Sequence, residues 1–181
     1  MSEQYAEKAR LYLDVDGVLN AVNFGLPQWG WGDPTRVEVN GWPITHSPDL
    51  VAAINEVAAT PGIGVYWLTT WCHDAPSKLA PALGLQGADW PVVGYDRWRS
   101  DDHKAWWKLL AIQEHLDGFE GGVLWIDDDL HYDRAAVEWL RDNPLVLGLC
   151  PRTENGITRR QADIVSDFAA RVTPTGKDGA Q

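Results

Sequence analysis

The 181-residue sequence has few cysteines and no long apolar run. Cys72 and Cys150 lie far apart and lack the close spacing of metal-binding cysteine pairs. We therefore expect both to be free thiols in or near the core of a reduced, intracellular chain. No stretch approaches the roughly 18 apolar residues of a membrane-spanning helix, and the N-terminus lacks the apolar segment of a signal peptide. These absences predict a cytoplasmic protein without a membrane partner.

Positive charge is also scarce. Fifteen Lys and Arg residues stand against 26 Asp and Glu residues, and the formal net charge is -11. This balance excludes an extended basic surface for binding a long nucleic acid, but it allows a nucleic acid end to be bound through one phosphate. Tryptophan, in contrast, is abundant, with 11 residues. We expect most of these rings to be half-buried packing residues and a few to be available for stacking a base.

The most informative segment is the strand-like run 11–15, which leads into two carboxylates and a glycine. Asp14 and Asp16 stand two residues apart, so their side chains point the same way and repel each other unless a cation or a proton lies between them. Gly17 allows the backbone to turn sharply. The pattern fits Mg²⁺ held by carboxylates and a substrate phosphate. An EF-hand calcium loop does not fit in either frame, and a strand ending in a solvated acidic turn is the plainer alternative.

Apolar and helical patterns alternate along the chain. Strands are expected over 11–15, 64–68, 123–126 and 145–149, with a further short strand over 91–94; helices are expected over 48–59, 100–116, 133–141 and 158–172. Strands without alternation, separated by helices, predict an α/β fold with a doubly wound parallel sheet covered on both faces. We expect one domain over 1–172 and a flexible tail over 173–181.

The segment 21–46 interrupts this alternation and is rich in Gly, Trp and Pro. Its dipeptide Asn40-Gly41 is the strongest short-range signal for a β-hairpin, so we expect a small β-flap inserted after the first strand. Trp29, Trp31 and Trp42 on this flap are candidates for stacking a base. No insertion is long enough to form a full cap domain, which predicts an open site.

Three of the expected strands end in polar groups. These are Asp14 and Asp16, then Thr69 and Thr70, then the run 127–129. Ligands of parallel α/β sheets bind at the carboxyl ends of the strands, so we expect these side chains to converge. Several carboxylates near one point cannot all stay ionised without a divalent cation. The convergence predicts a site rather than scattered surface charge.

The expected groups can together carry out phosphoryl transfer. Asp14 can attack phosphorus and form an acyl phosphate, and Asp16 can protonate the leaving oxygen and then deprotonate water. The Thr69 hydroxyl and the backbone N–H groups near Thr70 can bind phosphoryl oxygens, and Lys104 is the candidate for neutralising the transition-state charge. In the plainer alternatives, Thr69 caps a helix and Lys104 pairs with a neighbouring aspartate on the surface.

The string Asp14-Val-Asp-Gly-Val-Leu-Asn20 resembles the first motif of the haloacid dehalogenase (HAD) superfamily, with Thr69, Lys104 and Asp127-Asp128 in the places of its later motifs. The resemblance implies a Rossmann-like HAD fold, with Asp14 as nucleophile and Asp16 as general acid/base. It also implies Mg²⁺ as cofactor. The implied ligands of the metal are Asp14, Asp16 and Asp128, assisted by Asp127. The candidate phosphate- and substrate-binding residues are Gly17, Asn20, Thr70 and Trp71.

Within the superfamily, the segments 67–71, 125–129 and 155–158 are similar to the HAD domain of Swiss army knife RNA repair proteins and, more distantly, to the phosphatase half of polynucleotide kinase-phosphatases. This resemblance implies a Mg²⁺-dependent phosphomonoesterase that acts on the 3′-phosphate of a nucleic acid end during repair. A phosphatase of a small metabolite or a mononucleotide is the alternative within the same class. A non-catalytic binding domain is the alternative of another class.

Overall fold

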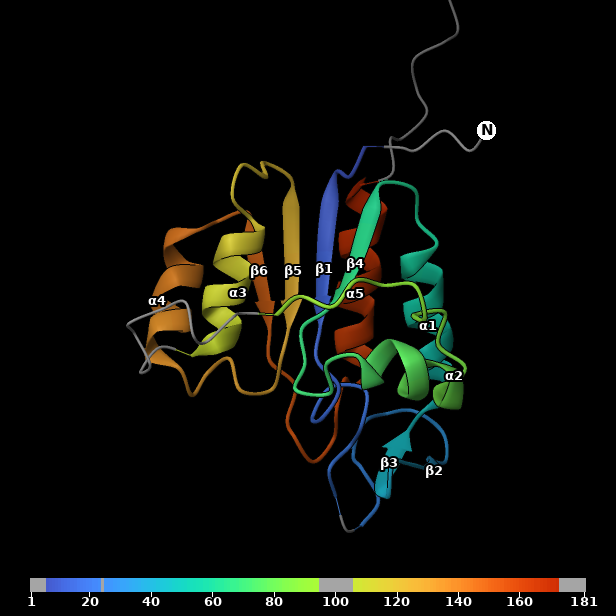
Figure 1. Ribbon diagram of the computed structural model, residues 1–181. Helices are drawn as coiled ribbons and strands as arrows, with labels where there is room; N and C mark the ends of the chain where they lie inside the picture. The colour runs from blue at the N-terminus through green and yellow to red at the C-terminus, as the bar shows by residue number, and fades with distance from the viewer. Residues whose placement is uncertain (1–5, 24, 95–105, 173–181) are drawn as a thin grey trace, which may run out of the picture.

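The computed structural model describes residues 6–23, 25–94 and 106–172, so the expected tail over 173–181 lies outside the described residues. Four parallel strands form the central sheet in the order β4-β1-β5-β6 (Figure 1). Their bounds are β1 (Ala9–Leu13), β4 (Ile63–Trp67), β5 (Gly122–Ile126) and β6 (Val146–Leu149). The first strand lies inside the sheet with later strands on both sides. The doubly wound parallel sheet expected from the sequence is therefore confirmed.

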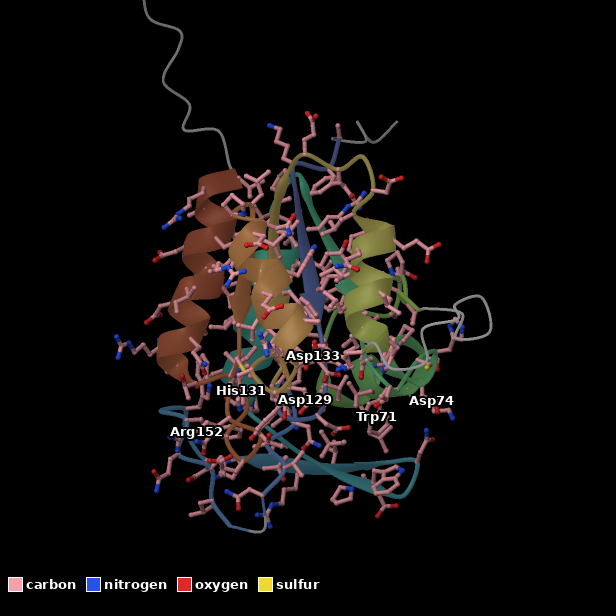
Figure 2. All side chains as sticks on the ribbon, turned by 90° about the vertical axis from the view of Figure 1, so that its left-hand side faces the viewer. Trp71, Asp74, Asp129, His131, Asp133 and Arg152 are labelled. Carbon is pink, nitrogen blue, oxygen red and sulfur yellow. The ribbon has the colours of Figure 1, made fainter. Side chains whose placement is uncertain are left out.

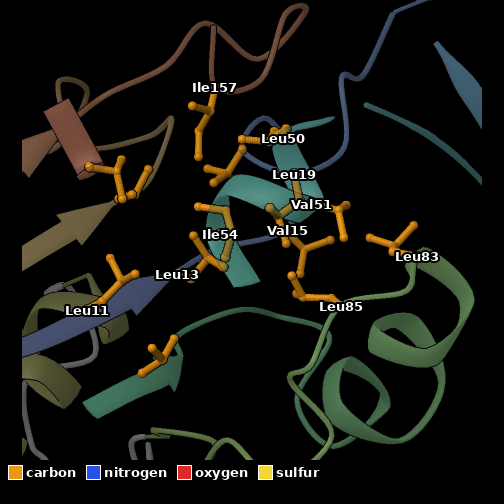
Figure 3. Close-up of a cluster of buried hydrophobic side chains, with 14 of the residues drawn as sticks. Leu11, Leu13, Val15, Leu19, Leu50, Val51, Ile54, Leu83, Leu85 and Ile157 are labelled. Carbon is orange, nitrogen blue, oxygen red and sulfur yellow. The ribbon is translucent and has the colours of Figure 1, made fainter. Parts of the chain in front are cut away.

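Helices cover both faces of this sheet (Figure 1). The helices α1 (Pro48–Ala58) and α5 (Arg159–Val172) cover one face, and α3 (Trp107–His115) and α4 (Arg134–Asp142) cover the other. Successive side chains of a strand point to opposite faces, so Leu11 and Leu13 of β1 pack with α1 and α5 (Figure 3), and Tyr12 packs with α3 and α4. Burial on both sides explains why β1 is apolar without alternation from Leu11 to Leu13.

Local capping signals start two of the helices where the sequence predicts them. The Ser47 hydroxyl accepts a hydrogen bond from the backbone N–H of Leu50, and Pro48 occupies the first helical position of α1, where its missing N–H costs nothing. At α5, Thr158 and Gln161 bond reciprocally, each side chain accepting from the other's backbone N–H. This capping box places the start of α5 beside Thr158.

The segment between β1 and α1 contains an antiparallel hairpin of β2 (Thr35–Val39) and β3 (Trp42–His46), beyond the carboxyl ends of the sheet strands (Figure 1). Asn40 and Gly41 connect the strands with φ angles of 54° and 78°. Two consecutive positive φ values define the type I′ turn that the Asn-Gly pair favours. The hairpin therefore forms where the sequence predicts it.

The helix expected over 100–116 begins later than predicted. Trp106 has an extended backbone with φ -65° and ψ 119°, and α3 starts at Trp107 without a side-chain cap. The prediction of a continuous helix from Ser100 to Leu116 is therefore wrong at Trp106. Residues 95–105 lie outside the described residues. The strand expected over 91–94 is reduced to a single parallel bridge between Val92 and Trp67 at the edge of the sheet.

Two further features differ from expectation. The segment after β4 contains a π-helical turn η1 (Ala75–Leu79) and a short α2 (Ala80–Leu83), although its prolines favour breaks. Pro76 and Pro81 lie in the first turns of η1 and α2, where a proline is tolerated. Cys72 is exposed and has a positive φ of 47°, so its expected place in the core is wrong. Cys150 is half-buried, and both thiols are free.

Candidate active site

Asp14 is the first residue after β1, and its backbone N–H continues the sheet ladder by donating to Ile126 (3.2 Å). Its carboxylate is buried and fixed at both oxygens. Oδ1 accepts from the backbone N–H of Val15 at 2.7 Å, and Oδ2 accepts from Nζ of Lys108 at 2.6 Å. The rigid sheet therefore presents one carboxylate in a single orientation, as a nucleophile requires.

Lys108 reaches Asp14 from the second residue of α3. It is buried and donates to Oδ2 of Asp127 at 2.7 Å as well, so one ammonium group bridges two buried carboxylates. The second oxygen of Asp127 accepts from the backbone N–H of Asp129 at 3.0 Å. Because Asp127 is inaccessible to solvent and both its oxygens are engaged, its direct effect is to hold Lys108 against Asp14.

The buried charges shift one another's pKa values. Burial raises the pKa of Asp14, and it raises the pKa of Asp127 to about 7, although the positive charge of Lys108 opposes both shifts. Burial alone would lower the pKa of Lys108, but the charges of the two carboxylates outweigh it and leave that pKa raised. The lysine therefore stays protonated, and the cluster has more negative charge than it can balance by itself.

Asp128 supplies a third carboxylate, and one ligand atom from each of Asp14, Asp127 and Asp128 lies within 4.8 Å of the other two. Burial raises the pKa of Asp128, while a hydrogen bond from the Thr153 hydroxyl, at 2.5 Å, opposes the shift. Gly17 packs directly against this carboxylate. A Cβ at position 17 would collide with Asp128, and the φ of 70° is itself unfavourable for other residues. The glycine of the first motif is therefore required by close approach.

This donor set fits a divalent cation. It consists of hard carboxylate oxygens, which are the ligands that Mg²⁺ prefers, and a 2+ charge would compensate the excess negative charge of the cluster. Of the four residues expected to bind metal, the structure brings Asp14, Asp127 and Asp128 together and leaves Asp16 outside that group. Asp14 and Asp128 line the cleft, whereas Asp127 is fully buried behind them, so Asp14 and Asp128 are the carboxylates best placed to hold the ion.

Asp16 is held by two different partners. Its Oδ1 accepts from Nδ2 of Asn20 at 2.7 Å, and its Oδ2 accepts from Nε1 of Trp71 at 2.8 Å. The side-chain oxygen of Asn20 accepts a hydrogen bond from the backbone N–H of Thr45 at 2.8 Å, and this bond connects the first motif to the hairpin. Asn20 and Trp71 were expected to bind phosphate or substrate. In the structure both orient Asp16.

The two threonines after β4 differ in position. Thr69 is buried, and its hydroxyl accepts from the backbone N–H of Trp71 at 3.3 Å. Thr69 also lies close enough to Asp14 for a hydrogen bond. This interaction lowers the pKa of the Asp14 carboxyl and so opposes the effect of burial, which raises it. Thr70 is exposed and lines the cleft above Asp14. The structure therefore brings both threonines to the carboxylates, as the sequence predicts.

A cleft of about 900 Å³ opens over this group. Asp14, Asp16, Lys108 and Asp128 line it, with hairpin residues on one side and Trp106 and Trp107 on another. Figure 2 shows labelled side chains, among them Trp71 and Asp129, gathered below the carboxyl ends of the strands. The hairpin lines one side of the cleft and is too small to be a cap domain.

The flap tryptophans are not equivalent. Trp29 is buried, and Trp31 donates its Nε1–H to the carbonyl of Ile157 and lies beneath the guanidinium of Arg159. Both are structural. Trp42 is 67% exposed and lines the cleft. Of the three rings considered for base stacking, only Trp42 is available.

Sequence reasoning missed Lys108 and Thr153. Lys104, the expected lysine, lies outside the described residues. No local signal separates Lys108 from Lys104, because Lys108 comes into the first turn of a helix only through the observed start of α3 at Trp107. Thr153 lies in a loop after β6 and carries no local signal.

The parallel sheet, with acidic groups at the ends of β1 and β5 and a buried lysine between them, defines a HAD-like domain. The family model described as the HAD domain in Swiss Army Knife RNA repair proteins matches residues 10–162, and the chain belongs to this family. No curated protein matches the chain significantly. Within the described residues, no helix has the length and apolarity needed to cross a membrane.

Proposed function

We propose that the chain is a Mg²⁺-dependent phosphomonoesterase that forms an aspartyl phosphate on Asp14. The observation that carries this proposal is the buried contact between Asp14 and Lys108 at the floor of the cleft, with Asp128 beside it. A purely structural ion pair would not need a third buried carboxylate next to it, nor access to a large cleft. A nucleophile that must accept a phosphoryl group needs both.

The first half-reaction joins Asp14 to phosphorus. A carboxylate oxygen of Asp14 attacks, the bond to the leaving oxygen breaks, and Asp16 donates a proton to that oxygen. Asn20 and Trp71 hold both oxygens of Asp16 at 2.7 and 2.8 Å, so its orientation is fixed before substrate arrives. Lys108 neutralises charge that develops around Asp14.

The second half-reaction releases phosphate. Asp16, now ionised, takes a proton from a water molecule that attacks the phosphorus of the acyl phosphate. The bond to Asp14 breaks, inorganic phosphate leaves, and Asp14 returns to a carboxylate. Mg²⁺ held by Asp14 and Asp128 would offset the negative charge of the phosphoryl oxygens.

We further propose that the substrate is a 3′-phosphate on a nucleic acid end. The family match supports this reading, since that family is described from RNA repair proteins. The cleft volume of about 900 Å³ also exceeds what a phosphoryl group needs and approaches the upper range of small-molecule pockets. A mononucleotide or small-metabolite phosphatase is the second candidate, favoured by the net charge of -11.

The test is phosphate release from an aryl phosphate, a set of mononucleotides and a 3′-phosphorylated oligonucleotide, with and without Mg²⁺. We expect Asp14→Asn to lower kcat by more than about 10³-fold, while Asp163→Asn, a matched change on the exposed face of α5, leaves it unchanged. Hydrolysis of small esters alone would favour the second candidate. No hydrolysis by the wild type of any substrate would overturn the proposal and favour a binding domain.

A further inference from the structure

The hairpin of β2 and β3 has two distinct faces. Side chains alternate along a strand, and Val37, Val39 and Ile44 of one face pack against the core cluster. Arg36 pairs with Thr45 in the register and Pro43 lies two residues from Thr45, so these three residues share the opposite face. All three line the cleft. One face of the hairpin is therefore used for folding, and the other forms a wall of the site.

This wall is fixed at both ends. At its base, the backbone N–H of Thr45 donates to Asn20, the residue that also holds Asp16. At its tip, Nδ2 of Asn40 donates to Asp74 at 2.9 Å. A wall that is ordered before binding loses little conformational entropy when a ligand contacts it. The hairpin is therefore suited to binding part of the substrate.

Arg36 puts a positive charge on this wall. Its guanidinium donates to the carbonyl of Gly25 at 3.1 Å. Among the described residues, no carboxylate lies within ion-pair distance of it. Lys108, in contrast, lines the same cleft but is bound by two carboxylates. In so acidic a chain, an arginine with donors to spare beside a phosphoryl-transfer cleft is matched to a second phosphate.

Trp42 adds an aromatic surface at the turn end of β3, where it pairs with Val39 and so begins on the hairpin face opposite Arg36. It lines the main cleft and also a smaller adjoining pocket of about 340 Å³ that contains Asp16 and Trp71. Its ring is largely exposed, although burying a tryptophan is strongly favourable. An exposed ring at the rim of a nucleotide-sized cleft is suited to stacking a base, and such stacking does not depend on which base it is.

We propose that Arg36 and Trp42 form a hairpin subsite that binds the nucleotide preceding the scissile phosphate, with Arg36 on the internucleotide phosphate and Trp42 against a base. The preferred substrate is then a phosphorylated nucleic acid end of at least two nucleotides. This inference rests on the proposed phosphomonoesterase activity. It explains how an acidic protein binds a nucleic acid end: one guanidinium and one ring next to the reacting phosphate replace an extended basic surface.

The experiment compares KM and kcat for three substrates: glycerol phosphate, adenosine 3′-monophosphate and the dinucleotide ApAp. We expect Arg36→Gln to raise KM about tenfold for ApAp alone, because only ApAp carries the internucleotide phosphate. The salt dependence of KM for ApAp should also fall in this variant. Trp42→Ala should raise KM about tenfold for both adenosine substrates, and Trp42→Phe should retain most of the affinity. For glycerol phosphate, all variants should match the wild type.

Glu38→Gln is the matched control, since Glu38 shares the hairpin face of Arg36 but does not line the cleft. We expect it to leave the KM for ApAp unchanged within twofold. Equal effects of Arg36→Gln on ApAp and on adenosine 3′-monophosphate would overturn the hairpin subsite while leaving the phosphatase activity intact. Absence of hydrolysis of glycerol phosphate, adenosine 3′-monophosphate and ApAp by the wild type would instead overturn the proposed function itself.

Discussion

Replacing Lys108 by methionine removes the ammonium group that bridges Asp14 and Asp127 and keeps an unbranched side chain of similar length. Breaking a buried ion pair by removing one partner costs about 3–5 kcal/mol, because a buried charge is left uncompensated. Asp127 already has a pKa raised to about 7 by burial, so without the lysine it takes up a proton at neutral pH. We therefore expect a loss of stability near the lower end, about 3 kcal/mol.

The effect of Lys108→Met on activity should be larger than its effect on folding. Removing one group that stabilises transition-state charge costs about 10²–10³ in kcat, and we expect a loss in this range. In the double variant Lys108→Met/Asp127→Asn no carboxylate at position 127 is left unpaired. Stability should then recover only in part, because Asp14 still lacks its buried ion-pair partner, whereas kcat should stay low.

The assay combines urea denaturation with phosphate release at saturating substrate. Lys78→Met is the control, because Lys78 is half exposed and pairs with Asp74 on the surface; such pairs contribute at most about 1 kcal/mol. Lys104→Met is the discriminating variant, since the sequence pattern favours Lys104. A kcat within threefold of the wild type for Lys108→Met, together with a large loss for Lys104→Met, would refute the assignment of the catalytic lysine.

Three further predictions test the site and its support. Gly17→Ala should lower both the melting temperature and kcat, because its Cβ would collide with Asp128; unchanged thermal unfolding would contradict this close approach. Thr153→Val removes the hydroxyl that orients Asp128 and should weaken Mg²⁺ activation about tenfold, measured as the Mg²⁺ concentration for half-maximal activity. Burial lowers the pKa of His46 and His115, so below about pH 6.5 the unfolded chain takes up their protons first and acid opposes folding. As the pH is lowered from 7 to 5, the urea midpoint of the wild type should therefore fall more than the midpoint of His46→Gln or of His115→Gln. A difference between wild type and variant that stays constant over this range would exclude this role of the two histidines.

Local sequence signals alone predict the first motif, the turn of the hairpin and the start of α1. The apolar strand followed by Asp14, Asp16 and Gly17 is recognisable from the sequence, and Asp14 does follow β1 directly. The strand expected over 11–15 ends at Leu13, however, so the two-residue period does not extend to Asp16, which lies outside the carboxylate group. The turn at Asn40-Gly41 and the cap at Ser47 are equally local, since each depends on the backbone preference or hydrogen bonding of one or two residues. These elements were predictable, and the structure contains them.

Tertiary structure decided which lysine meets Asp14. Lys104 and Lys108 are one helical turn apart and would share a face of the helix expected from Ser100. The extended backbone of Trp106 starts α3 later and places Lys108 in its first turn, between Asp14 and Asp127. Whether a lysine is buried depends on the strands packed against it and not on its neighbours in the sequence, so no local pattern separates the two candidates.

Long-range packing also assigned the polar and aromatic residues around the motif. Asn20 reaches Thr45 across 25 positions of the chain, and Thr153 reaches Asp128 across 25. Trp31 and Trp42 lie in one segment, yet Trp31 is held by the loop before α5 and Trp42 faces the cleft. The sequence by itself determined that carboxylates gather at the edge of a parallel sheet. Only the tertiary structure decided which side chains orient them and which remain free for a ligand, because partners distant in sequence satisfy some polar groups and leave others open.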